Sequence, residues 1–147
     1  MFRGRYQHTI DPKGRLSVPA KYRDQLAQYD GHTLIVVPNE HAIEVHPLEE
    51  WEQFESLVNK QSSFNPEIRK VGRLYISRAK EVDLDGVGRI LLPPDTRQAV
   101  GVQRDITLVG GGRKYFEIWD RTRFEEWERL NIDSLPSAFE ALSQLGV

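Results

Sequence analysis

The sequence contains no cysteine among its 147 residues. This absence excludes disulfide bridges and thiolate chemistry, and it suits a reducing compartment. No apolar run approaches the roughly 20 residues that span a bilayer, and no apolar segment typical of a signal peptide follows the first residues. We therefore expect a cytoplasmic protein without a membrane partner. A chain of this length can bury one core or two small modules that share a core.

Patterns for metal binding and catalysis are also scarce. The four histidines, His8, His32, His41 and His46, have no H-x-x-x-H or H-E-x-x-H spacing. No serine lies in a G-x-S-x-G motif. The glycine run 110–112 lacks the Gly-Lys-Ser/Thr ending of a phosphate loop, and we interpret it as a hairpin turn. We expect no metal, no cofactor, no small-molecule substrate and no enzymatic activity.

The net charge is only −2, which is low for a protein that binds nucleic acid. The charges are nevertheless segregated, because residues 1–23 contain six Lys or Arg and a single acid, Asp11. Residues 39–56 contain six Glu and no Lys or Arg, and the charged side chains beyond Arg129 are all acidic. Composition alone leaves two interpretations open: a basic face that binds DNA, or ordinary solvated surface.

An internal repeat organises the chain. Residues 10–19 recur as residues 84–93 with Asp, Gly, Arg and Pro at a constant offset, and Arg23 recurs as Arg97. After a slip of one residue, the segment 43–45 matches 116–118. Two aromatic pairs then correspond, Trp51 and Phe54 with Phe124 and Trp127. The repeat therefore spans a whole module.

Each copy predicts the same series of elements. The first strand and the return strand are joined by a turn, and Asp11-Pro12-Lys13-Gly14 is typical of a type I turn that closes a hairpin. A short helix follows from about Ala20 or Asp95. The predicted strands are Tyr6–Ile10, Arg15–Val18, Thr33–Val37 and Ala42–His46 in the first copy, and Lys80–Leu84, Arg89–Leu92, Asp105–Val109 and Tyr115–Trp119 in the second.

Three longer helices are also predicted. The first carries an apolar stripe from Leu48 to Val58, which we assign to the core. The second begins at Asn65 as N-cap, with Pro66 in the first turn. The third begins at Asp120 and carries Phe124 and Trp127, aromatics that we expect in the core rather than stacked on bases. The segment from residue 134 is predicted to be a loosely held helix or mobile.

The repeated Asp-x-x-x-Arg is the strongest candidate site. A carboxylate beside a guanidinium suggests acid–base chemistry, but Asp at this position caps turn amides and the arginine keeps it ionised, so we interpret the aspartate as structural. A projecting turn suits DNA, because Arg reads guanine edges and Lys binds phosphates. Stabilisation of the turn alone remains the alternative for Arg15. The candidate DNA contacts are Arg3, Arg5, Lys13 and Arg15, and the structural turn residues are Asp11, Gly14, Asp85 and Gly88.

The opening residues Met-Phe-Arg-Gly, the segment 11–19 and its copy 85–93 resemble the MraZ family, and the resemblance covers almost the whole chain. It implies a β-rich α+β fold in which two AbrB-like swapped-hairpin modules form one pseudo-twofold β-barrel with flanking helices. The expected boundaries are 1–60 for the first module with its helix, 61–78 for a linking helix, 79–130 for the second module with its helix, and 131–147 for a C-terminal tail.

The resemblance also implies a function. Family members are bacterial transcriptional regulators that bind direct repeats in double-stranded DNA ahead of the division and cell-wall gene cluster, including their own gene, and assemble into rings. It adds Arg89 to the DNA contacts and implies a nucleoid-associated homo-oligomer. The second copy has Val87 in place of Lys13 and Gly86 in place of Pro12, so we weight the N-terminal turn more heavily.

Other functional classes remain to be weighed. An AbrB-like antitoxin binds DNA through its barrel and a toxin through its tail, and the acidic tail leaves this open, although here the tail is short and follows a complete pair of modules. A metabolite-binding enzyme and an RNA-binding protein are weaker alternatives, because neither a polar pocket nor an aromatic strand face is evident. For the ring contact, the candidates are the helix with Trp51 and Phe54 and the helix from Ile68 to Tyr75.

Overall fold

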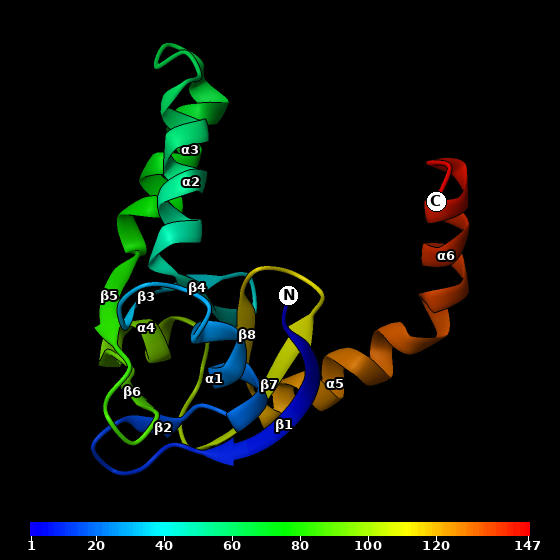
Figure 1. Cartoon of the computed structure of the whole chain (residues 1–147). Coiled ribbons are helices and arrows are strands. Elements are labelled where there is room, and N and C mark those ends of the chain that lie inside the picture. The colour runs from blue at the N-terminus through cyan, green and yellow to red at the C-terminus, as the bar shows by residue number, and fades with distance from the viewer.

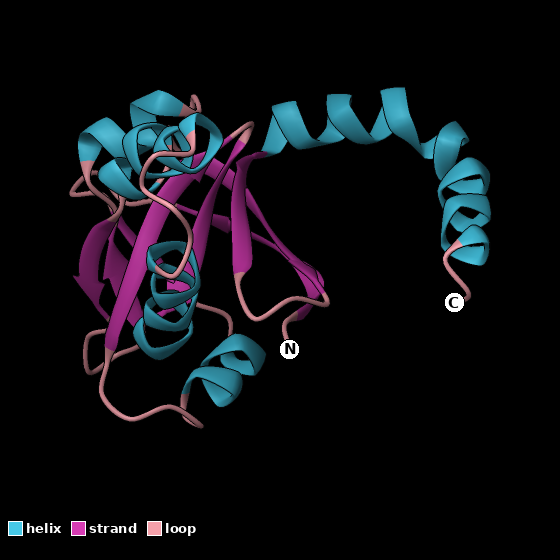
Figure 2. Cartoon of the chain, turned by 90° about the horizontal axis from the view of Figure 1, so that it is seen from above, coloured by secondary structure: helices cyan, strands magenta, loops and turns pink.

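A computed structural model describes residues 1–147 as an α+β fold with a six-stranded antiparallel sheet and a separate two-stranded ribbon (Figures 1 and 2). The strands are β1 (Arg3–Thr9), β2 (Arg15–Ser17), β3 (Thr33–Asn39), β4 (Ala42–Pro47), β5 (Lys80–Asp83), β6 (Arg89–Leu91), β7 (Asp105–Gly111) and β8 (Phe116–Asp120). The helices are α1 (Ala20–Leu26), α2 (Leu48–Asn59), α3 (Pro66–Leu74), α4 (Pro94–Ala99), α5 (Arg121–Asn131) and α6 (Leu135–Gln144), with short 3₁₀ turns η1 (Ile76–Arg78) and η2 (Ile132–Ser134).

The two halves of the chain exchange strands. The turn at residues 11–14 forms as predicted, with the Gly14 amide donating to the Asp11 carbonyl at 2.9 Å. The local hairpin expected around it is wrong, because β1 pairs with β7 and β2 pairs with β6. In the other half, β5 pairs with β3. The strand order is β1-β7-β8-β4-β3-β5, and the sheet ends at β1 and β5 without closing into the expected barrel.

The second hairpin of each half forms locally. β3 pairs with β4 and β7 with β8, as the sequence predicts. β3 continues beyond its predicted end at Val37, and Pro38 lies within it opposite Ile43. At the centre of the sheet β4 pairs with β8, which joins the halves and places Glu44 directly opposite Glu117.

The main core fills the space between the inner face of the sheet, the ribbon and α1. Leu16 of β2 and Ile90 of β6 are both buried in it. An aromatic cluster packs beside them, with ring centroids 5.4 Å apart for Phe2 and Tyr22 and 4.7 Å apart for Tyr22 and Phe116. Because the core draws residues from both halves, neither half can bury its apolar face alone.

Helices cover the outer face of the sheet at two places. Helices α2 and α3 lie side by side at one end of the sheet (Figure 1). Trp51 and Phe54 of α2 have ring centroids 5.4 and 5.7 Å from that of Tyr75, the residue that follows α3. Tyr75 thus covers Trp51 and Phe54 of α2, whereas Leu57 of α2 and Leu74 of α3 are exposed, so the suggested ring contacts on these helices stay open.

Helix α5 packs Phe124 against the Trp119 ring of β8 at 5.1 Å. Phe124 is buried as the sequence predicts, but the prediction for Trp127 is wrong, because its ring packs on Trp119 at the end of the sheet and stays 42% exposed.

The C-terminal segment forms an arm that leaves the body of the molecule. Helix α5 leads away from the sheet, and α6 turns off its end without lying on the sheet (Figures 1 and 2). The segment predicted to be loosely held is thus a regular helix, α6. Four of its large apolar side chains are exposed: Leu135, Phe139, Leu142 and the C-capping Leu145.

Two glutamates face each other on the outer side of the central strands. The carboxylate of Glu44 is buried and accepts hydrogen bonds from Asn39 at 2.9 Å, from His46 at 3.0 Å and from the Tyr75 hydroxyl. Burial alone would raise the pKa of Glu44, but these hydrogen bonds outweigh it and hold the pKa below its ordinary value. The network ties the end of α3 to β4.

The carboxylate of Glu117, opposite Glu44, has fewer hydrogen-bond partners. Glu117 accepts one hydrogen bond, from the Trp119 indole at 3.1 Å. Burial raises the pKa of Glu117, and the nearby charges of Glu44 and Glu40 raise it further. The charged form of Glu117 therefore destabilises the fold at pH values above its raised pKa.

Glu117→Gln is expected to raise the melting temperature at pH 7 by about 3 °C, because glutamine removes the partly buried charge and keeps an acceptor for Trp119. The gain should disappear at about pH 3, well below the ordinary Glu pKa, where Glu117 is protonated in both the folded and unfolded chains. Thermal melts at the two pH values test this.

Glu44→Gln is the matched control and should lower the melting temperature at pH 7. Because the folded pKa of Glu44 is depressed, its stabilising contribution is present above the ordinary pKa and is lost as the pH falls through the folded value. If both variants shift the melting temperature in the same direction, the roles given to the two carboxylates are wrong.

Candidate nucleic-acid interface

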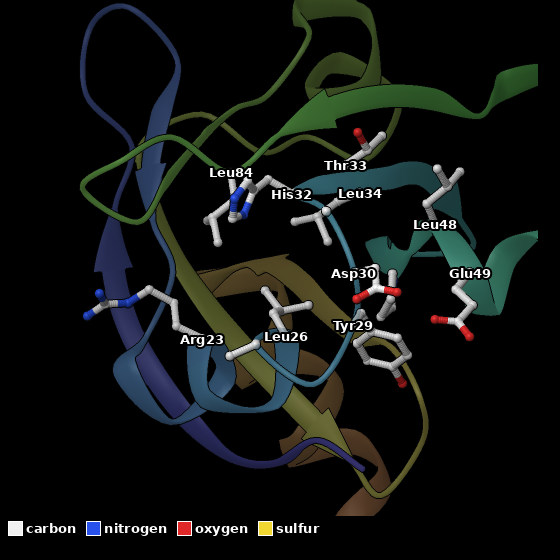
Figure 3. Close-up of a pocket in the computed structure, with 13 residues that line it drawn as sticks. Arg23, Leu26, Tyr29, Asp30, His32, Thr33, Leu34, Leu48, Glu49 and Leu84 are labelled. Atoms are coloured by element: carbon white, nitrogen blue, oxygen red, sulfur yellow. The ribbon is translucent and has the colours of Figure 1, made fainter.

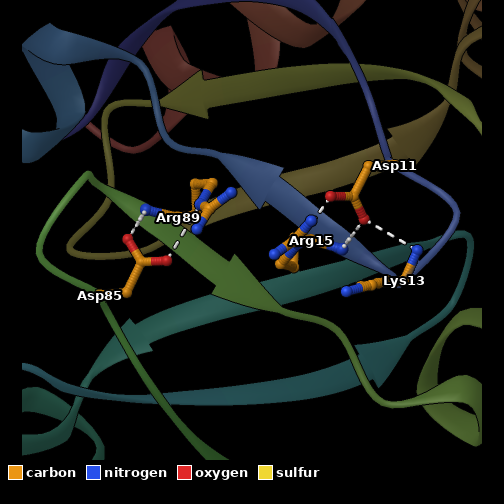
Figure 4. Close-up of polar contacts among 5 residues, drawn as sticks. All are labelled: Asp11, Lys13, Arg15, Asp85 and Arg89. Atoms are coloured by element: carbon orange, nitrogen blue, oxygen red, sulfur yellow. Dashed lines mark hydrogen bonds and ion pairs between the residues drawn. The ribbon is translucent and has the colours of Figure 1, made fainter.

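The first turn is held together by the carboxylate of Asp11. One oxygen, Oδ1, accepts the backbone amides of Lys13 at 3.0 Å and Arg15 at 2.8 Å, and the other, Oδ2, accepts Nε of Arg15 at 2.7 Å (Figure 4). The amide of Arg15 is the first cause of a lowered pKa at Asp11, although burial opposes it. These hydrogen bonds support a structural role for Asp11, and an ionised carboxylate does not suit a general acid.

The second turn repeats this geometry. Oδ1 of Asp85 accepts the amides of Val87 at 3.0 Å and Arg89 at 2.8 Å, and Oδ2 accepts Nε of Arg89 at 3.0 Å (Figure 4). The pKa of Asp85 is lowered by the same backbone hydrogen bond. The bond from Nε to the aspartate of the turn therefore fixes the orientation of each arginine side chain.

The β2–β6 ribbon places the two arginines on one surface. Leu16 and Ile90, which are opposite each other, point into the core. Because strand side chains alternate, the flanking residues face outward, and Arg15 pairs with Leu91 while Ser17 pairs with Arg89. The side chains of Arg15 and Arg89 are 35% and 36% exposed, and no terminal guanidinium nitrogen of either makes a hydrogen bond within the chain. These nitrogens are free to contact a ligand.

The tips of the two turns differ. Lys13 is exposed and its amine is in no ion pair. Val87, its counterpart, is 67% exposed and uncharged. The ribbon surface therefore has one arginine from each half. The additional positive charge of Lys13 lies only beside the first turn.

The structure does not bring Arg3 and Arg5 to this surface. Arg3 pairs with Gly111 at the start of β1, whereas the turn follows the end of β1. The guanidinium of Arg5 forms an ion pair with Glu128 and lies 4.9 Å above the ring of Phe124. Arg5 thus holds α5 against the sheet, while Arg3 stands apart from the turns.

Sequence reasoning missed two residues of the outward face, Ser17 and Leu91, the latter 56% exposed. Their strands were predicted, but the pairing of β2 with β6 was not. Strict alternation from the buried Leu16 would have identified Ser17 as outward-facing, whereas nothing local pairs it with Arg89.

A hollow of about 330 Å³ lies beside the second turn (Figure 3). Its floor is apolar, with Leu26, Leu34 and Leu84, and its rim carries Arg23 and His32. Asp30 and Glu49 lie on its other side (Figure 3). The lining includes no serine or cysteine that could act as a nucleophile, and no group of His, Asp and Glu in the chain is arranged to hold a metal ion.

No helix in the structure combines the length and apolar character needed to span a bilayer. Among the surfaces of the chain, the ribbon is where several predicted site residues converge, namely Lys13, Arg15 and Arg89.

The sequence was compared with known proteins. A family model described as "MraZ protein, putative antitoxin-like" matches residues 1–74 and again residues 75–143. A protein named transcriptional regulator MraZ from Nitrosospira multiformis is 42% identical, with 97% of this chain and 99% of the relative covered. Proteins of the same name from Marinomonas sp. and Salmonella paratyphi B are 39% and 40% identical, covering 92% and 98% of this chain and 88% and 95% of those relatives.

Proposed function

Because the chain belongs to the MraZ family, whose relatives above are named transcriptional regulators, we propose that it regulates transcription by binding double-stranded DNA through the outward face of the β2–β6 ribbon. Arg15 and Arg89 would read base edges, and Lys13 would bind a phosphate. The single observation that carries the proposal is the pair of oriented arginines, one from each half, on one exposed ribbon.

The dimensions of the ribbon support this use. The major groove of B-DNA admits a two-stranded β-ribbon, and Arg recognises guanine by two parallel hydrogen bonds from its guanidinium. Here Nε of each arginine is bonded to its aspartate, so the two terminal nitrogens remain available. The symmetric repeat of the halves would let the two arginines approach the bases in equivalent ways.

The low net charge is consistent with the proposal if several copies act together. One ribbon with two arginines and one lysine offers few phosphate contacts, so a single copy should bind weakly. A ring of copies that engages direct repeats would bind each further repeat at a high effective concentration. We propose such repeats ahead of the division and cell-wall gene cluster, including the protein's own gene, which would make the protein nucleoid-associated.

The test is binding to the DNA upstream of the protein's own gene, compared with random DNA of equal length, across a series of salt concentrations. Specific binding should exceed non-specific binding by about 10³-fold or more at physiological salt. Equal affinity for the two DNAs would refute sequence-specific regulation by this chain. The slope of affinity against salt counts the phosphate contacts.

Self-association, which the proposal requires, has a candidate surface in the exposed stripe of α6. Leu135, Phe139 and Leu142 follow a spacing of three and four residues, so they lie on one side of the helix. Each is more than two-fifths exposed. A single short helix is marginally stable in water without packing, so a partner that covers the stripe would stabilise it.

Phe139→Asp is therefore expected to reduce the oligomer to smaller species, because the charge would be buried in the apolar contact. Light scattering coupled to size-exclusion chromatography measures the mass directly. Gln144→Asp adds the same charge on the opposite side of α6 and should leave the mass unchanged. A wild-type mass for Phe139→Asp would exclude the stripe as the contact.

The antitoxin-type alternative keeps one supporting observation, since the same exposed stripe lies on an arm whose charged residues are Asp133 and Glu140. In that case α6 would bind a different protein. A monomeric wild-type protein whose α6 is nevertheless required in the cell would favour this alternative over the ring.

A further inference from the structure

Two arginines outside the turns have no assigned role, although they occupy equivalent places in the repeat. Arg23 lies in α1 and Arg97 lies in α4. We propose that each is a positioning residue for the turn of the opposite half: Arg97 holds the first turn (residues 11–14), and Arg23 holds the second turn (residues 85–88). The consequence for DNA binding rests on the proposed function, whereas the positioning itself does not.

Besides its internal hydrogen bonds, the first turn has a set of contacts with the second half at Gly14. The carbonyl of Gly14 accepts the backbone amide of Leu92 at 2.9 Å. The carbonyl of Leu92 in turn accepts Nε of Arg97 at 3.2 Å. The guanidinium then lies against Gly14, where a Cβ would be 3.2 Å from Nη2 of Arg97. Gly14, Leu92 and Arg97 thus form a closed set of contacts.

The second turn is held in the same way by the first half. The carbonyl of Gly88 accepts the amide of Val18 at 2.9 Å, and the carbonyl of Val18 accepts Nε of Arg23 at 3.1 Å. A Cβ at Gly88 would lie 2.6 Å from Cδ of Arg23. The two sets of contacts are equivalent and crossed.

Three features make these contacts specific. Gly14 and Gly88 have φ values of +88° and +82°, which glycine adopts without strain, and the absence of a side chain lets the guanidinium approach the backbone. Val18 and Leu92 are buried, so each arginine links its turn to the core. A planar guanidinium can donate from Nε while lying flat on a backbone, which a lysine amine cannot do.

The crossed arrangement predicts which turn becomes disordered when one of the two arginines is removed. Loss of Arg97 should loosen the first turn, which carries Lys13 and Arg15, and leave the second turn ordered. A residue that only stabilises its own half, or that only contacts DNA, would not produce this pattern. The proposal can therefore be tested on the free protein, without DNA.

The experiment is backbone amide hydrogen exchange, followed by NMR on the full chain. The amides of Lys13 and Arg15 report on the first turn because both bond to the Asp11 carboxylate. The amides of Val87 and Arg89 report on the second turn in the same way. Each set thus measures the order of one turn.

Arg97→Ala should accelerate exchange at the first turn by about fivefold or more, as expected for the loss of a hydrogen bond, and leave the second turn unchanged. Arg23→Ala should do the reverse. Arg97→Lys, which keeps the charge and the stem, should behave like Arg97→Ala and serves if the alanine variant folds poorly. Gln98→Ala and Asp24→Ala, at exposed neighbouring positions, are the controls. The proposal is wrong if each variant speeds exchange mainly in the turn of its own half, equally in both turns, or in neither turn.

DNA binding gives a second readout through double-mutant cycles. If Arg97 acts by positioning the first turn, adding Arg97→Ala to Arg15→Ala should cost clearly less affinity than the two losses multiplied, since only the Lys13 contact remains to be lost, whereas adding it to Arg89→Ala should multiply the two losses. If the affinity losses of Arg97→Ala and Arg15→Ala multiply fully in the double variant, then Arg97 does not affect DNA binding by positioning the first turn. A crossed exchange pattern in a protein that does not bind DNA would support the positioning and refute the proposed function.

Discussion

Arg15→Ala is expected to lower the affinity for the cognate DNA by about one to two orders of magnitude, the discrimination that one bidentate arginine–guanine contact contributes. The loss should be larger on cognate than on random DNA, because a base contact is lost. Asp11 would still accept the amides of the turn, so the fold should change little. Titrations of both DNAs with wild type and variant measure the effect.

Two companion variants sharpen this result. Arg15→Lys keeps the charge but lacks the planar fork, so it should lose most of the specificity and retain the salt dependence. Arg89→Ala should cause a comparable loss if the ribbon reads DNA with both strands. Arg129, an exposed arginine paired with Glu126 on α5, provides the control Arg129→Ala. Wild-type affinity for Arg15→Ala would exclude this arginine as a base contact.

Gly110→Ala is expected to destabilise the protein by about 2–4 kcal/mol. A Cβ at this position would lie 2.6 Å from the backbone nitrogen of Arg3 and 2.7 Å from its Cα. Backbone atoms of a paired strand cannot move aside as a flexible side chain can, so β1 must separate from β7 locally. The strand contributed by one half to the other would be weakened.

The neighbouring glycine provides the control. A Cβ at Gly111 meets no atom within 4 Å, and Gly111 is not among the glycines with positive φ. Gly111→Ala should therefore remain within about 0.5 kcal/mol of wild type. Urea unfolding followed by circular dichroism gives both values. Equal stabilities for the two variants would contradict the close approach of β1 at Gly110.

Much of the local structure could be predicted because the contacts that form it lie within a few residues. The Asp11 turn needs only a carboxylate, two amides and a guanidinium within five positions, and the second turn repeats it. The helix starts at Asn65 and Asp120 were likewise predicted, since the capping side chains bond amides two or three residues away.

The site was only partly predictable. Lys13, Arg15 and Arg89 share the ribbon as the repeat and the family resemblance suggested, but Arg3 and Arg5 lie elsewhere on β1. The ion pair of Arg5 with Glu128 joins residues that are far apart in the sequence, and charge counts in the N-terminal segment carry no information about it. The sequence shows that a segment is basic, whereas the fold decides which of its basic side chains form ion pairs within the chain.

The sequence by itself thus determined the repeat, the geometry of both turns and the helix caps. Only the tertiary structure decided the partners of β1, β2, β5 and β6, since the same alternation of side chains suits a local hairpin and an exchanged partner equally well. It also decided that Glu44 faces Glu117 and that Arg23 and Arg97 hold the opposite turns. The physical reason is that these contacts join residues from different halves of the chain, which only burial of one shared core brings together.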